Sequence, residues 1–174
     1  MTATAESISN PVGVNNDLAT AMLDAVNNGL MMCDLSARCV ALSRVPSSDV
    51  GVVTGLIGVH GKVSGFITVN MSERFALRAV GGLLGEKFDE LNSQVVDGAG
   101  EMTNIICGGI KSSLAKTVWA FQQITVPSVI VGTGYQIAYA RGLEFGSVTF
   151  ELDDPDAIVL QDRLMNVSIS LLKL

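Results

Sequence analysis

The period of the hydrophobic pattern changes three times along this chain, and these changes limit the folds open to it. Residues 17–32 carry apolar side chains at helical spacing, and strand-like runs follow them. Two further helical patterns come next, and strand-like runs return in the last third of the chain. This order predicts an α+β fold in which antiparallel strands, in two groups, are covered by long helices.

Two strand-like runs, residues 51–59 and 62–70, are rich in Val, Ile and Thr. Only His60 and Gly61 separate them, which predicts an antiparallel hairpin. The other strand-like segments are residues 39–45, 120–131, 135–141 and 145–152, and a last apolar stretch covers 164–174.

The two middle helices have predictable limits. Ser72 is a residue type that caps helix N-termini, and the helical spacing after it continues to about Leu84. The second pattern runs from about Asn92 to Lys116 and is the longest in the chain.

The first and second halves of the chain resemble each other weakly in sequence. Residues 61–69 and 142–150 share the pattern G-x-x-x-G-x-[IV]-T-[VF], and the helices before them contain D-x-x-N at residues 24–27 and E-x-x-N at residues 101–104. This predicts two similar halves. The alternative is a chance match between two glycine-containing strands.

Length and composition restrict the class of protein. A chain of 174 residues, of which 48% are hydrophobic and 16% charged, is expected to form one domain over residues 14–174 after a flexible leader, residues 1–13. The net charge of −6 argues against a nucleic-acid partner. No apolar run is long enough to cross a membrane, and residues 1–16 lack the features of a secretory signal, so we expect a cytoplasmic protein without a membrane partner.

The inventory of reactive side chains is small. His60 is the only histidine, and Cys33, Cys39 and Cys107 have the spacing of neither a zinc site nor a redox pair, so we expect no metal site and buried free thiols. No G-x-S-x-G, P-loop or dinucleotide-binding pattern is present. The chain is expected to carry no cofactor of its own.

The helix over residues 92–116 carries the most informative pattern. At about 100° per residue, one polar stripe about 60° wide contains Asp97, Glu101, Asn104 and Gly108. Gly108 lacks a side chain and would let another backbone come close, and Lys111 and Ser112 flank the far end of the stripe. The opposite side, expected to pack on a sheet, has Ala99, Met102, Ile106, Ile110 and Ser113, with Leu114 at its edge. The alternative is an ordinary solvated helix face.

The spacing of this stripe is similar to the D/S-x3-E-x2-N-x22-P signature of the CheC, CheX and FliY phosphatases of bacterial chemotaxis. The matching residues are Asp97, Glu101, Asn104 and Pro127. The chain resembles the family also in F-D-E-L at residues 88–91, in Gly108, and in the order of elements over residues 14–152. A single E-x-x-N site is more similar to CheX than to CheC, which has two. In the first helix Asp24 replaces the glutamate and Val50 stands where a proline would be, so that half is interpreted as degenerate.

The resemblance implies a phosphatase that accelerates hydrolysis of the phospho-aspartate of a CheY-type response regulator. The regulator would supply the magnesium ion, the lysine and the phosphoryl group. Asn104 would orient the attacking water, and Glu101 would pair with the partner's lysine. Asp97, Gly108 and Lys111 are the expected partner contacts, while Pro127 is expected to fix a turn or strand start.

Two alternatives remain. The same surface could belong to a non-catalytic module that binds a response regulator or a second subunit, or the chain could be a self-contained hydrolase, which the missing His, Cys and metal constellations oppose. The resemblance and the exposed edges of the Val/Ile/Thr-rich strands both predict a homodimer.

Overall fold

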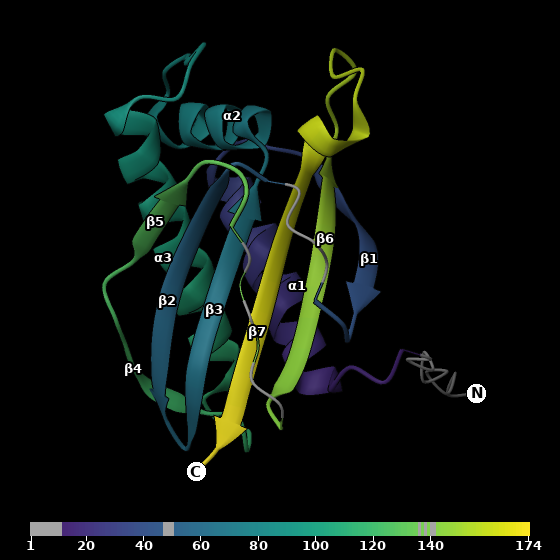
Figure 1. Cartoon of the computed structure of the whole chain (residues 1–174), viewed down its shortest axis with the longest axis vertical. Coiled ribbons are helices and arrows are strands. Elements are labelled where there is room, and N and C mark those ends of the chain that lie inside the picture. Colours follow the sequence, from purple (N-terminus) through teal and green to yellow (C-terminus); the bar gives the residue numbers. More distant parts are fainter. Residues whose placement is uncertain (1–11, 47–50, 136, 138, 140–141) are drawn as a thin grey trace, which may run out of the picture.

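The chain forms one antiparallel sheet with two long helices packed on one face and a shorter helix across one end, as Figure 1 shows. The structure is a computed structural model and describes residues 12–46, 51–135, 137, 139 and 142–174. Its helices are α1 (Asn16–Met32), α2 (Glu73–Leu84), α3 (Ser93–Leu114) and the short 3-10 helix η1 (Leu160–Arg163). Its strands are β1 (Ala37–Ser43), β2 (Val53–Gly61), β3 (Val63–Met71), β4 (Phe121–Ile124), β5 (Ser128–Val131), β6 (Glu144–Leu152) and β7 (Leu164–Lys173). The α+β class and the antiparallel pairing predicted from the sequence are confirmed.

The expected two groups of strands are joined into a single sheet. The order is β1-β6-β7-β3-β2-β4, with β5 also paired to β2. The join is the β3–β7 ladder, which runs over nine residue pairs from Val63 opposite Lys173 to Met71 opposite Met165. β7 therefore lies at the centre of the sheet, a position that the sequence pattern of residues 164–174 did not predict.

The strand order has the symmetry expected of two similar halves. Exchanging β1 with β4, β2 with β6 and β3 with β7 gives the same strand order read from the opposite edge of the sheet. A pseudo-two-fold axis therefore lies between β3 and β7. The G-x-x-x-G echo, however, links β3 with β6, which are not equivalent strands. The halves are supported by the topology, and the echo over residues 61–69 and 142–150 is not part of that relation.

Equivalent helices begin in the same way. Asn15 caps α1 by accepting a hydrogen bond from the backbone N–H of Asp17 at 3.0 Å, and Asn92 caps α3 by accepting one from Val95 N–H at 3.0 Å. Ser72 caps α2 as predicted, accepting from Phe75 N–H at 3.1 Å. The caps fix where each helix starts and so fix which residues share a face.

The two long helices pack directly on each other through glycines. A Cβ on Gly109 would lie 2.9 Å from the Ala25 Cβ, and a Cβ on Gly29 would lie 3.2 Å from Ile106. The close contact explains why α3 tolerates a glycine at position 109, which costs roughly 1 kcal/mol relative to alanine in a helix interior. Behind the helices, one continuous core joins both halves of the sheet.

The second half of the sheet differs from the expected runs. The predicted strand over residues 120–131 is divided into β4 and β5, because Pro127 has no N–H to donate to β2. At the break, Thr125 N–H donates to Gly58 O and the Thr125 hydroxyl accepts from Gly58 N–H, both at 2.9 Å.

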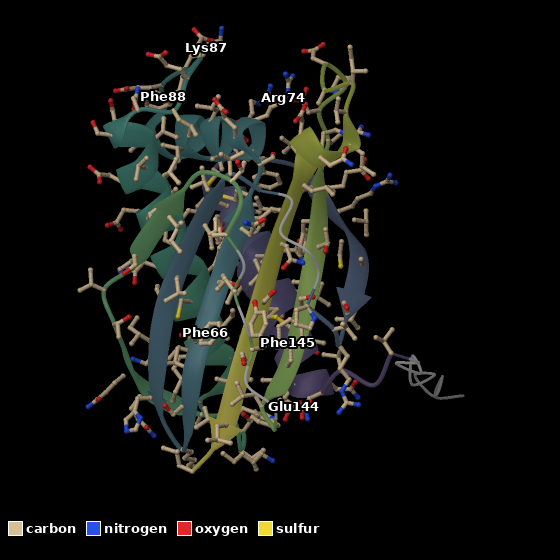
Figure 2. All side chains as sticks on the ribbon, viewed as in Figure 1. Phe66, Arg74, Lys87, Phe88, Glu144 and Phe145 are labelled. Carbon is tan, nitrogen blue, oxygen red and sulfur yellow. The ribbon has the colours of Figure 1, made fainter. Side chains whose placement is uncertain are left out.

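The predicted strand at residues 135–141 is wrong where it can be assessed. Tyr135, Ile137 and Tyr139 are in no strand, and residues 136, 138, 140 and 141 lie outside the described residues. Tyr135 hydrogen-bonds through its hydroxyl to Thr54, and the Tyr139 ring stacks on Phe66 with centroids 5.5 Å apart. Phe66 and Phe145 lie on the sheet face turned away from the long helices (Figure 2). These contacts hold the Tyr135 and Tyr139 side chains against residues of β2 and β3.

The loop after β6 is tied to α2 by a buried carboxylate. Asp154, of which 1% of the side chain is exposed, accepts hydrogen bonds from Arg74 at 2.8 and 3.1 Å. These bonds to the Arg74 guanidinium hold the pKa of Asp154 below its ordinary value. Figure 2 shows Arg74 at the same end of the molecule as Lys87 and Phe88. The ion pair fixes the loop that follows β6 relative to α2.

Candidate functional site

The polar stripe predicted on the third helix is exposed on α3. Asp97, Glu101 and Asn104 are exposed, while Gly108 and Lys111 are half-buried. They follow one another at helical spacing from the first third of α3 to its last turn. All five residues predicted for the site and its partner contacts therefore lie along the same side of one helix.

The reverse side of α3 is buried, as predicted. Val95, Gly98, Ala99, Gly100, Met102, Thr103, Ile106, Cys107, Ile110 and Leu114 are buried there. Ser113, which was expected on this side, is exposed. The burial leaves the helix little freedom to rotate and so fixes the direction of its exposed residues.

Thr103 holds α3 against the sheet immediately before Asn104. It is fully buried, donates a hydrogen bond from its hydroxyl to Ala99 O at 2.7 Å, and lies where a side chain on Gly55 of β2 would be. A Cβ on Gly55 would overlap the Thr103 side chain, so the missing side chain of Gly55 sets the distance between helix and sheet. The sequence pattern gave no signal for this contact, since it joins residues far apart in the chain.

The signature proline lies beside the same helix. A Cβ on Gly100 would lie 3.4 Å from Val129 Cγ2 and 3.9 Å from Pro127 Cβ, so the start of β5 packs against α3 next to Glu101. Pro127 directly precedes β5, as expected. The spacing of 22 residues between Asn104 and Pro127 is the length of chain that leaves α3 and returns along the sheet edge.

The Glu101 and Asn104 side chains are available for a partner. Neither forms a hydrogen bond or an ion pair with any residue that the structure describes. The described ranges also contain no group of three His, Cys, Asp or Glu side chains that could hold a metal ion. The site consists of an unpaired carboxylate and an unpaired amide about one helical turn apart.

A groove continues from Asn104 toward the C-terminal end of α3. Its volume is about 690 Å³, and its walls are α3 and β4. Asn104, Gly108 and Lys111 form the α3 wall, and Gln122 and Ile124 belong to the β4 wall. The sequence pattern gave no signal for the β4 wall, which depends on the sheet topology.

The equivalent face of α1 is also exposed. Asp24 and Asn27 lie nine and twelve residues after the cap Asn15, as Glu101 and Asn104 do after the cap Asn92. Both α1 side chains are exposed. The position that corresponds to Gly108 is Met31, which is 69% exposed.

The remaining reactive side chains lie elsewhere. His60 is the last but one residue of β2 and not a turn residue. All three cysteines are free, and Cys33 and Cys107 are buried as expected. The prediction for Cys39 was wrong: it is exposed because β1 is an edge strand whose outer side is uncovered. Burial raises the pKa of Cys107 to about 12, so this thiol stays protonated at neutral pH.

No helix in the described part of the chain is long and apolar enough to span a membrane.

Comparison with known proteins identifies the family. The profile of the family described as "Chemotaxis phosphatase CheX" matches residues 53–151, more than half of the chain. No curated protein has significant sequence similarity to the chain. Among solved structures, the chemotaxis protein CheX from Vibrio vulnificus is 26% identical, with a TM-score of 0.75 over 90% of this chain and 99% of the other.

Two further structures are informative. CheX from Borrelia burgdorferi, solved in a complex with CheY, BeF3 and Mg²⁺, is 26% identical with a TM-score of 0.70 and covers 90% of this chain and 99% of its own. FliY from Thermotoga maritima is 14% identical with a TM-score of 0.60, over 94% of this chain and 92% of its own, and shares the fold. The chain thus belongs to the CheX family of chemotaxis phosphatases.

Proposed function

We propose that this chain accelerates hydrolysis of the phospho-aspartate of a CheY-type response regulator. The observation that carries the proposal is the pair Glu101 and Asn104, exposed and unpaired on a helix whose other side is buried. Membership in the CheX family and the complex of Borrelia burgdorferi CheX with CheY support it.

The role of Asn104 is to hold the attacking water in line with the phosphorus atom. Phosphoryl transfer needs little beyond positioning and charge stabilisation, and the regulator is proposed to supply the magnesium ion. An amide donates and accepts hydrogen bonds without titrating, so it orients a water without repelling the phosphoryl oxygens. Because Asn104 protrudes from a helix, it can enter a partner's active site.

The role of Glu101 is to fix the docking position. Its carboxylate lies one turn before Asn104 on the same exposed side and would form a charge-assisted contact with a lysine of the regulator. Asp97 lies one further turn away on the same side and would add a weaker contact with the regulator. Neither residue would become covalently modified.

Gly108 and Lys111 complete the proposed partner contacts. A Cβ on Gly108 would meet nothing within 4 Å. The missing side chain therefore leaves free space at the surface of α3 and no cavity in the core. That space is where the backbone of the regulator would come close to α3.

The test is the decay rate of a phosphorylated CheY-type regulator in the presence of Mg²⁺. Wild-type protein should accelerate the decay, and Asn104→Ala should lose about 10²- to 10³-fold in rate, the effect of removing one preorganised polar group. Asn104→Ala should still bind the regulator. If wild type and variant bind equally and neither accelerates decay, the chain is a non-catalytic docking module.

We also propose a homodimer in the cytoplasm, where response regulators act. In the described part of the chain both edges of the sheet lack a neighbouring strand, and β1 and β5 expose Val40 (45%) and Val131 (47%). Light scattering at micromolar concentration should give twice the mass of the chain, and a monomeric mass would contradict the dimer.

A further inference from the structure

The groove beyond Asn104 is long relative to the catalytic pair. Its α3 wall runs from Asn104 to the C-cap residue Ala115, about 16 Å at 1.5 Å per residue. The β4 wall is formed on the side that faces α3, since Ile124 lies opposite the buried Val59 in the sheet. A surface that docked only through Glu101 and Asn104 would leave this groove empty.

Charge is distributed unevenly along the exposed side of α3. Asp97 and Glu101 precede Asn104, whereas Lys111 follows it. Of the described residues that line the groove, none is acidic and Lys111 alone is charged. The chain as a whole has a net charge of −6, so this basic end differs from the average surface.

The rest of the groove is apolar or neutral. Phe121 and Ala120 are buried in its wall and Ile124 is half-buried, while Gln122 exposes its amide. The Ser112 hydroxyl donates to Gly108 O at 3.0 Å, which ties it to the helix. The groove therefore suits an apolar side chain flanked by a carboxylate.

We infer that this groove selects the response regulator by binding a segment next to the regulator's active site that carries an acidic and an apolar side chain. The inference rests on the proposed function. If Asn104 reaches the phosphoryl group and Glu101 the partner's lysine, the register along α3 places the adjoining surface of the regulator over Lys111 and Ile124. Lys111 pairs with the carboxylate there, and the β4 wall accepts the apolar group. Lys111 is a specificity residue and takes no part in orienting the water.

The experiment compares Lys111→Glu and Lys111→Gln with wild type. CheY phosphorylated with acetyl phosphate in Mg²⁺ is the substrate, and initial rates at several concentrations separate KM from kcat. Lys111→Glu should raise KM at least about tenfold and Lys111→Gln less, with kcat unchanged, because only the docking charge is altered. A regulator in which the contacting acidic residue is replaced by lysine should restore the KM of Lys111→Glu.

Arg44→Glu is the matched control. Arg44 is exposed and follows β1, at the sheet edge opposite β4, and its replacement changes the net charge by the same amount. An unchanged KM in Lys111→Glu, or an equal rise in Arg44→Glu, would overturn the inference while leaving the phosphatase function intact.

A second readout separates the two proposals. If wild type does not accelerate decay, the proposed function fails, and the groove is then judged by the affinity for CheY activated with BeF3 and Mg²⁺. A weaker affinity in Lys111→Glu, with Arg44→Glu unchanged, supports the groove as a docking site. Equal affinities contradict it.

Discussion

The exposed faces of α1 and α3 carry the same residue pattern but have different surroundings. Both helices begin at an asparagine cap and carry an acidic residue and an asparagine at the same positions after it. On α3 these residues are Glu101 and Asn104. On α1 they are Asp24 and Asn27, and all four side chains are exposed.

The surroundings of the two pairs differ. After Asn104 the helix surface opens at Gly108 into the groove against β4, whereas after Asn27 the corresponding position is filled by the exposed Met31. The sheet edge beside α3 is broken between β4 and β5 at Pro127, while β1 at the equivalent edge is one strand with a bulge between Cys39 and Ala41. We therefore expect only the α3 pair, which lies beside an open groove, to act on a partner.

The largest expected difference between the faces concerns the asparagines. Asn104→Asp should be nearly inactive, with a loss of about 10²- to 10³-fold in rate, because a carboxylate repels the phosphoryl oxygens that the amide tolerates. Asn27→Asp makes the same change on α1 and should leave the rate unaltered. The decay of phosphorylated CheY measures both, and a loss in Asn27→Asp would show that α1 also takes part in hydrolysis.

The second largest difference between the two faces is expected when the acidic residues Glu101 and Asp24 are replaced. Glu101→Gln removes a charge-assisted contact, worth about 1.5–3 kcal/mol, so kcat/KM should fall by roughly 10- to 100-fold. Asp24→Asn should not change kcat/KM. Raising the salt concentration should lower the kcat/KM of wild type more than that of Glu101→Gln, since the variant has lost the charge that salt screens. Equal salt dependence would argue against an ion pair at Glu101.

The sequence predicted the position of the candidate residues on α3 better than the fold around them. The polar stripe depends only on helical spacing within one element, and the structure keeps its five predicted residues on one side of α3. The cap at Ser72 is likewise a local signal. Such features are decided by the chain within about one helical turn.

The features that were missed depend on contacts between distant segments. The central position of β7, the β4 wall of the groove and the Thr103–Gly55 contact each join residues from different elements. The predicted strand at residues 135–141 failed where it is described, because Tyr135 and Tyr139 make side-chain contacts across the sheet. Alternating apolar residues do not reveal which surface they cover.

Exchanging the residues that differ between the faces should produce a smaller effect. Gly108→Met places the α1 side chain into the approach path on α3, so KM should rise by about tenfold while the chain itself meets no clash. Because glycine costs roughly 1 kcal/mol relative to a good helix former, the melting temperature should not fall. Loss of activity with retained stability would identify a docking defect. An unchanged KM would show that the partner does not come close to Gly108.

The last prediction has the smallest expected effect. It tests whether the residue pattern and the glycine are enough to give the α1 face the activity proposed for α3. The variant Asp24→Glu with Met31→Gly gives α1 the same E-x-x-N and glycine as α3, and it is measured in an Asn104→Ala background so that any rate comes from α1. We expect no recovered phosphatase activity, because the edge beside α1 is the continuous strand β1 and lacks the break at Pro127. The same double change with Asn104 intact should keep the wild-type rate, which controls for folding. Recovered activity in the Asn104→Ala background would instead show that the helix pattern and the glycine are sufficient, and that the groove contributes to choosing the regulator without being required for hydrolysis.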